Sequence, residues 1–204
     1  YKSEQTDFAL QIKKLSKTQG RNEENYPASR KRQVNRRFRH KKYEVALDFD
    51  AIFIPDTAEK IAQIAPQLAF YDIDRVLLMG TNLWHSDKLI HTARDYVQEA
   101  IMADAFYAED SKESVQKFVT VFDELHGQRP GFIEALAYDT AMINFNTLSD
   151  PDIQSRKDLK DRLKNLRNFE GVTGYTSFKK NGDSNKQLYL LQIENNQFVQ
   201  LNRN

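Results

Sequence analysis

The stretch from Phe169 to Ile193 constrains the fold of this chain more than any other. It holds two glycines three positions apart, Gly171 and Gly174, then an Asn-Gly pair at 181–182, then an apolar run that begins at Leu188. An Asn-Gly pair between short strand patterns is typical of a β-hairpin. A hairpin that follows a long helical region has little core of its own. We therefore expect it to dock on a sheet begun much earlier, so that the chain leaves one lobe and returns to it.

The first half of the chain alternates between strand and helix patterns. Phe49–Ile54 is an apolar run typical of a buried parallel strand, and Thr57–Phe70 repeats apolar residues at helical spacing. A second strand is expected at Arg75–Met79, a helix at Ser86–Ala93 and a third extended stretch at 96–106. This succession predicts an α/β fold with a parallel sheet and right-handed crossovers.

Three helices with no strand between them are expected next, at 111–125, 130–148 and 149–166. Such helices cannot cover their own apolar faces well, so we expect them to need a sheet that this chain does not supply. An exposed apolar face of this kind also permits a homotypic contact between copies.

Composition excludes several classes of protein. The 204 residues include no cysteine, which rules out disulfides and thiolate metal sites, and no apolar run approaches the ~20 residues of a membrane helix. The first residue is Tyr1 rather than Met, from which we expect a piece of a longer protein.

A basic block interrupts the pattern at residues 30–42. It holds eight Lys or Arg and no acid, while the whole chain has a net charge of only +1, so the remainder is acidic. A solvated surface helix or insertion is the ordinary interpretation. Phe38 is its only aromatic residue, and the acidic remainder opposes a polyanion, so we expect no nucleic-acid partner.

Five short motifs, in order, resemble one family. They are Thr6-Asp7-Phe8 with Gln11-Ile12, Phe49 to Ile54, Leu78-Met79-Gly80-Thr81, Ala135 to Ala141 with Tyr138-Asp139, and Phe169 to Gly174 with Phe178 and Gly182. Together they resemble the second half of type I periplasmic substrate-binding proteins of the branched-chain amino-acid family. Each motif alone is weak, but their order is specific to that superfamily.

The resemblance implies a three-layer parallel-sheet lobe with a C-terminal β-hairpin, plus helices that belong to the other lobe. Residues 1–107 and 168–204 would form the second α/β lobe, and residues 108–167 would be the helical segment that packs on an absent first lobe. The function implied is non-catalytic solute binding in the periplasm or cell envelope, with a small polar ligand such as an amino acid.

One stretch, Ile61 to Ile73, resembles a different subgroup, the penicillin-binding protein activators. These are exported lipoproteins that bind cell-wall synthases, and a lipid anchor outside this chain would then provide the membrane contact. The basic block favours this alternative slightly, because transport receptors have little use for it.

Ligand-binding candidates follow from the sheet. Ligands of doubly wound sheets sit beyond the carboxyl ends of the strands, where helices begin. The candidates are Asp56, Thr57, Gly80, Thr81, Asn82, Trp84 and Tyr107. Capping of the following helix is the commoner role of Asp56 and Thr57 at this position, and Gly80 is also explained as a turn residue. Trp84 either covers a ligand or is buried, and Tyr107 either lines a cleft or, as we favour, anchors a hinge.

Catalytic and metal patterns are missing from the sequence. The four histidines (His40, His85, His91 and His126) lie on separate elements without ligand spacing. The chain has no Gly-x-Ser-x-Gly elbow, phosphate loop or thiol, and no carboxylate pair stands out. We expect no enzyme activity, cofactor or metal.

Overall fold

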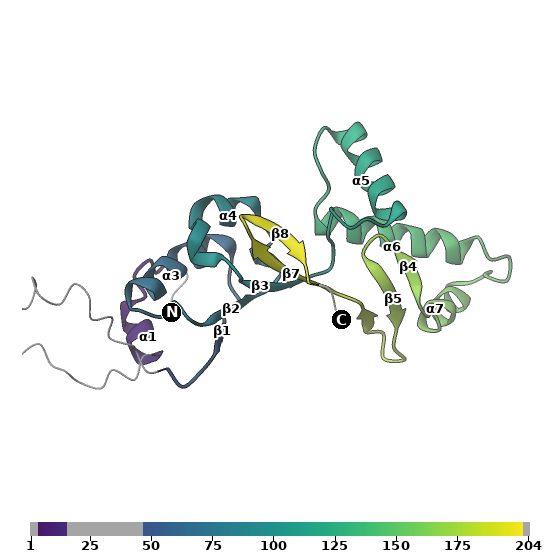
Figure 1. The fold of residues 1–204 in the computed structure, drawn as a ribbon. Helices are drawn as coiled ribbons and strands as arrows, with labels where there is room; N and C mark the ends of the chain where they lie inside the picture. Colours follow the sequence, from purple (N-terminus) through teal and green to yellow (C-terminus); the bar gives the residue numbers. More distant parts are fainter. Residues whose placement is uncertain (1–3, 16–46, 202–204) are drawn as a thin grey trace, which may run out of the picture. The chain divides into compact units, whose positions relative to one another are not determined.

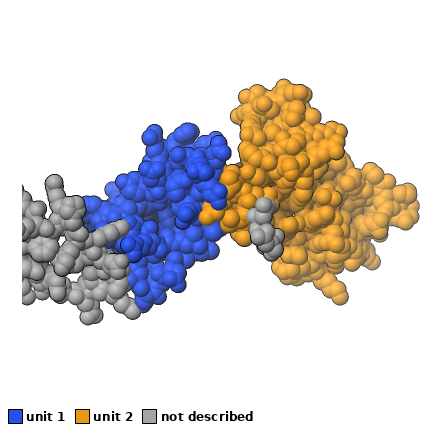
Figure 2. Space-filling view, in the orientation of Figure 1, with its two compact units in different colours: residues 1–101, 193–197 blue, residues 102–192, 198–204 orange. Residues whose placement is uncertain are grey.

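The computed structural model describes residues 4–15 and 47–201, so the basic block at 30–42 lies outside the described residues. The chain divides into two compact units, shown in two colours in Figure 2. Unit 1 is Tyr1–Ile101 with Ile193–Gln197, and unit 2 is Met102–Gln192 with Phe198–Asn204. The chain therefore passes between the units three times. Within the described ranges, no helix has the length and apolar character needed to cross a membrane.

Unit 1 contains the predicted strand–helix alternation. Strand β1 (Ala51–Phe53) pairs in parallel with β2 (Leu77–Gly80), with Phe53 opposite Met79. Helix α3 (Ala58–Phe70) connects the two strands, as the sequence predicted. After β2 come a 3-10 turn, η2 (Asn82–Trp84), helix α4 (Asp87–Ala93) and a second 3-10 turn, η3 (Arg94–Val97).

The core of unit 1 lies under one face of α3. Its residues Ile61, Ile64 and Leu68 are buried and follow the helical spacing expected from the sequence. Helix α1 (Ala9–Leu15) contributes the buried Ile12, and Phe8, just before the helix, is also buried. The side chain of Gln67 bonds the backbone next to α1, because its amide oxygen accepts the Phe8 N–H at 2.8 Å.

The end of the chain returns to the sheet that β1 and β2 begin. Strands β3 (Ile101–Asp104), β7 (Tyr189–Glu194) and β8 (Gln197–Gln200) complete a five-stranded sheet in the order β1-β2-β3-β7-β8 (Figure 1). The turn between β7 and β8 is Asn195-Asn196, and both residues have positive φ, as a tight hairpin requires. The predicted return of the chain is confirmed for these two strands.

Unit 2 combines the predicted helices with a second sheet. The helices are α5 (Glu113–His126), α6 (Phe132–Leu148) and α7 (Arg156–Lys164). Strands β4 (Phe169–Gly171), β5 (Gly174–Phe178) and β6 (Ser184–Lys186) form a three-stranded antiparallel sheet. One apolar core joins helices and sheet; its buried members are Phe106, Val115, Phe118, Val119, Ala135 and Val172.

The structure divides the stretch that the sequence treated as one hairpin. The strand that returns from the Asn-Gly turn is β6, and the apolar run from Leu188 leads into β7 of the other sheet. The compact units accordingly group residues 168–192 with the helices, whereas the sequence prediction grouped 168–204 with 1–107. The reason is a tertiary contact: Val172, in the β4–β5 turn, is buried in the helical core.

Candidate functional site

The carboxyl ends of β1 and β2 carry the predicted polar loops. After β1, the Asp56 carboxylate accepts the Thr57 N–H at 2.7 Å, and the Thr57 hydroxyl accepts the Lys60 N–H at 3.4 Å, which caps α3. After β2, the Thr81 hydroxyl accepts the Leu83 N–H at 3.3 Å and caps η2. The capping role that the sequence allowed for Thr57 is therefore present, and Thr81 has the same role in the second loop.

Trp84 links these two loops. Its indole N–H donates to the carbonyl oxygen of Asp56 at 3.0 Å, and its side chain is completely buried. The ring lies against Gly80, where an added Cβ would approach ring carbons to 2.1 Å. Of the two predicted roles for Trp84, the structure shows the buried one, so its ring is not available to cover a ligand from this loop.

Polar groups at this edge remain accessible around the buried indole. Thr57 is exposed, while Asp56, Thr81 and Asn82 are half-buried. The Thr81 hydroxyl accepts a capping bond and keeps its own proton for donation. The start of α3, a helix of 13 residues, lies in the same loop, where the Asp56 carboxylate and the Thr57 hydroxyl already accept two backbone N–H groups.

Tyr107 lies in unit 2, soon after the first passage of the chain between the units. It is buried, and its hydroxyl donates to the carbonyl oxygen of Phe198 at 3.1 Å. Its ring centroid is 6.1 Å from that of Tyr189, whose hydroxyl donates to the Asp110 carboxylate at 2.7 Å. Burial is the main cause that raises the pKa of both phenols. The charges of Glu109 and Asp110 raise the pKa of Tyr107 further, and Asp110 does the same for Tyr189. These contacts support the anchoring role that the sequence favoured for Tyr107.

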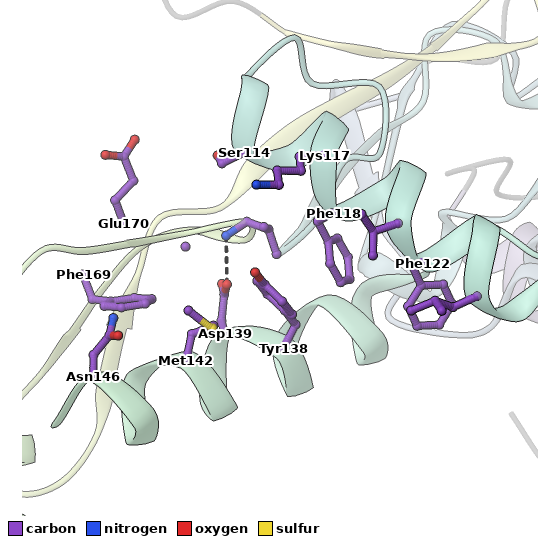
Figure 3. Close-up of a pocket in the computed structure, with 14 residues that line it drawn as sticks. Ser114, Lys117, Phe118, Phe122, Tyr138, Asp139, Met142, Asn146, Phe169 and Glu170 are labelled. Atoms are coloured by element: carbon purple, nitrogen blue, oxygen red, sulfur yellow. Dashed lines mark hydrogen bonds between the residues drawn. The ribbon is translucent and has the colours of Figure 1, made fainter. Parts of the chain in front are cut away.

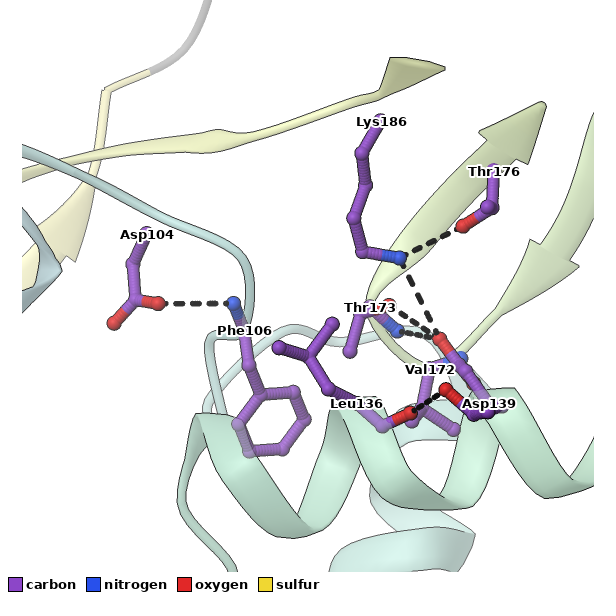
Figure 4. A network of polar contacts seen from close by, with 9 residues as sticks. Asp104, Phe106, Leu136, Asp139, Val172, Thr173, Thr176 and Lys186 are labelled. Atoms are coloured by element: carbon purple, nitrogen blue, oxygen red, sulfur yellow. Dashed lines mark hydrogen bonds and ion pairs between the residues drawn. The ribbon is translucent and has the colours of Figure 1, made fainter. Parts of the chain in front are cut away.

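A buried carboxylate organises the β4–β5 turn (Figure 4). Asp139, on α6, is 2% exposed and accepts the backbone N–H groups of Val172 at 2.8 Å and Thr173 at 2.9 Å. The Thr173 hydroxyl also donates to it. The ammonium of Lys186 lies 3.9 Å from the same carboxylate and donates to the Thr176 hydroxyl at 2.7 Å. Burial lowers the pKa of Lys186, and the Asp139 charge opposes that shift.

A cavity of about 490 Å³ opens between α5, α6 and β4 (Figure 3). Its walls are mainly apolar and include Phe118, Phe122, Tyr138, Met142 and Phe169. No sequence pattern predicted this cavity or a role for Asp139. The signal available was the Tyr138-Asp139 pair, which was quoted for the family resemblance without a function.

The described residues hold no cluster of three or more His, Cys, Asp or Glu that could bind a metal ion. Of the described histidines, His91 lies on α4 and His126 on α5, while His85 follows η2.

Comparison with known proteins identifies the family. The family model of the periplasmic binding proteins matches residues 45–197, which is most of the chain. The chain therefore belongs to the periplasmic binding protein family, and the α/β fold class predicted from the sequence is confirmed. A search of the curated proteins gave no match.

Solved structures support the same fold. The leucine-binding protein LivK of Thermotoga maritima is 20% identical, with a TM-score of 0.67, and the match covers 99% of this chain and 49% of that one. LivJ of Streptococcus pneumoniae, solved with isoleucine, is 20% identical with a TM-score of 0.63, over 98% and 51%. A branched-chain amino-acid ABC transporter protein of Rhodospirillum rubrum is 25% identical with a TM-score of 0.69, over 74% and 44%. The chain thus spans about half the length of these relatives.

Proposed function

We propose that this chain is part of a non-catalytic solute-binding receptor that serves an ABC-type transporter, and that it supplies one wall of the ligand cleft. The observation that carries the proposal is the family match over residues 45–197, because it includes the polar loops after β1 and β2. The matched structures are named as transporter substrate-binding proteins, which favours this reading over the cell-wall synthase activator. Membership of the family also supports export to the periplasm.

The proposed ligand is a small carboxylic acid. LivJ was solved with isoleucine. A Desulfitobacterium hafniense protein, 25% identical to this chain, was solved with leucine, and a Rhodopseudomonas palustris protein was solved with 3,4-dihydroxybenzoic acid. All three ligands carry a carboxyl group. In this chain, the Thr81 hydroxyl and the side-chain amide of Asn82 offer hydrogen-bond donors to such a group. Asp56, Thr57, Gly80, Thr81 and Asn82 form the proposed ligand wall.

In the proposed organisation, the helices of unit 2 are one part of a lobe, and the other part of that lobe is not contained in this chain. LivK and LivJ are about twice as long, although nearly all of this chain aligns with each. Six large apolar side chains of α5 and α6 are exposed: Val121, Leu125, Ile133, Tyr138, Phe145 and Leu148. Val121, Leu125 and Tyr138 among them line the cavity between α5, α6 and β4. An apolar surface of this extent is typical of an interface. We place the missing part of the lobe there, over the cavity between α5, α6 and β4.

Ligand titration tests the proposed function. The polypeptide that carries this chain is titrated calorimetrically with leucine, isoleucine and 3,4-dihydroxybenzoate, with methyl esters of the same compounds as controls. Binding of an acid but not of its ester is the expected result. Asn82→Ala is expected to weaken it about tenfold, since a hydrogen bond to a charged group contributes roughly 1.5 kcal/mol. Asn185→Ala, an exposed amide on β6, is the matched control.

Two outcomes would contradict the proposal. Absence of heat or thermal stabilisation across the panel would remove solute binding as the function. Equal weakening by Asn82→Ala and Asn185→Ala would place the ligand away from the ends of β1 and β2.

A further inference from the structure

A basic groove in unit 2 lies apart from the residues proposed to bind a solute. It has a volume of about 370 Å³ and runs between α7 and the β5–β6 hairpin. From α7 come Arg156, Lys160 and Lys164, and Leu159 and Leu163 lie between them. Phe178 and Gly182 of the hairpin complete the lining. We name this surface the α7 groove.

The charges of the α7 groove form a single row. Arg156, Lys160 and Lys164 are four residues apart, so they follow one side of the helix over about 12 Å. None of the three has an ion pair with another residue in the described part of the chain. Like charges at this spacing destabilise an isolated helix slightly. A row of this kind therefore favours an anionic partner outside the helix.

Neither acidic residue of α7, Asp158 or Asp161, lines the groove. Asp158 is engaged at the helix start, where its carboxylate accepts the Ser155 hydroxyl at 2.7 Å and the Gln154 N–H at 3.3 Å. These bonds lower its pKa, with the Ser155 bond the larger cause. Arg162, a further cation of α7, is paired with Asp150 at 2.5 Å on another side of the helix and does not line the groove.

The floor of the α7 groove is apolar and only half covered. Leu159, Leu163 and Phe178 are each partly exposed, and α7 contains no buried residue. Three half-exposed apolar side chains behind a row of cations match a partner with apolar side chains flanked by carboxylates. The groove thus combines two features of a helix- or strand-recognition site, an apolar slot and a charged rim.

We propose that the α7 groove binds an acidic peptide segment of a partner protein, with leucine-like side chains on the floor and carboxylates along Arg156, Lys160 and Lys164. Charge complementarity selects an anionic partner. Concavity selects a peptide over a lipid surface, because the apolar residues line a recess between two elements, whereas a bilayer-binding helix presents its apolar face outward. Figure 1 shows α7 beside the β4–β5 strands of this unit.

A labelled peptide tests this proposal with matched charge variants. The probe is a fluorescein-labelled twelve-residue peptide of repeated Glu-Glu-Leu-Leu, and its Gln-for-Glu analogue is the control. Fluorescence anisotropy is expected to show saturable binding of the acidic peptide that weakens as salt rises from about 50 to 500 mM. Lys160→Glu is expected to weaken binding about tenfold, since one attraction becomes a repulsion.

Lys157→Glu is the matched control, because it makes the same charge change on the same helix away from the groove lining. It is expected to weaken binding less than about twofold. Both positions are exposed, so both variants are expected to fold, which circular dichroism checks.

Four outcomes would overturn the proposal. These are no binding of the acidic peptide, equal binding of the Gln analogue, equal loss in the Lys157→Glu and Lys160→Glu variants, and binding to anionic phosphatidylglycerol vesicles in place of the peptide. The solute titration described above is independent of each of them.

Discussion

Replacing Asp139 is expected to destabilise unit 2 more than any other single carboxylate replacement on its helices. In Asp139→Ala, the N–H groups of Val172 and Thr173 and the Thr173 hydroxyl lose their acceptor inside the core. Each buried donor left without a partner costs about 1–3 kcal/mol. The ammonium of Lys186 also loses its nearby negative charge. Allowing for water that enters the gap, we expect a loss of about 3–5 kcal/mol in the free energy of unfolding.

Asp139→Asn is a milder form of the same change. Its side chain keeps one acceptor oxygen but turns an amide N–H₂ towards donors, so we expect a loss of about 2 kcal/mol. A loss of this size leaves a protein of ordinary stability, ~5–15 kcal/mol, folded enough to measure. This variant therefore carries the test if Asp139→Ala does not fold.

Urea denaturation followed by circular dichroism measures both variants. Asp123→Asn is the matched control, since Asp123 lies exposed on α5, and it is expected to change stability by less than about 0.5 kcal/mol. A double-mutant cycle with Thr173→Val is expected to give a coupling energy of about 1 kcal/mol. If Asp139→Ala costs less than about 1 kcal/mol, the carboxylate does not organise the β4–β5 turn and the reasoning is refuted.

Two further predictions concern other parts of the structure. Gly80→Ala is expected to lower the free energy of unfolding by about 2–4 kcal/mol and to red-shift the emission of Trp84, the chain's one tryptophan, because the new Cβ meets its ring at 2.1 Å. Gly131→Ala is the control, since its Cβ meets only a flexible carboxylate at 3.1 Å. Equal losses of stability in the two variants would contradict the packing argument. The folded pKa of Tyr189 lies above its unfolded value of about 10, so its contribution to stability is complete below pH 10 and is lost as the pH rises through the folded pKa. In Tyr189→Phe, the free energy of unfolding is expected to fall less steeply above pH 10, measured by urea denaturation. An unchanged slope would count against a raised pKa of the buried phenol.

The parts of the fold that local signals determine were predictable from the sequence. Thr57 precedes an apolar repeat of period 3.6, and the structure places it as the cap of α3. The apolar run around Ile52 is followed by a helix and a second strand, and β1 pairs with β2 in parallel. In each case the deciding residues lie close together in the sequence, so periodicity and capping rules apply.

The division of the C-terminal strands was not predictable in the same way. Whether β4 to β6 join the first sheet or a second one depends on the contact of Val172 and Thr173 with Asp139, more than 30 residues earlier in the chain. No local pattern encodes a pairing over that separation. The α7 groove has the same origin, because it requires the hairpin residue Phe178 to lie beside a helix whose own sequence is only a charged amphipathic repeat.

The positions of the candidate ligand residues at the strand ends were predictable, but the packing around them only partly. Asp56 and Thr81 follow strands β1 and β2, as the topology of an α/β sheet requires. The burial of Trp84 depends on Gly80, which leaves room for the indole ring where any side chain would collide with it. A glycine four residues before a tryptophan was visible in the sequence, but it does not by itself distinguish a buried ring from an exposed one.

The three passages of the chain between the units have a consequence for proteolysis. Neither unit is a continuous segment, since unit 1 ends with Ile193–Gln197 and unit 2 with Phe198–Asn204. A protease cut inside either unit leaves two fragments that each contribute residues to that unit. Noncovalent contacts within the unit then hold the nicked molecule together, and the fragments are expected to separate only after denaturation. For the same reason, no single truncation of the gene isolates either half.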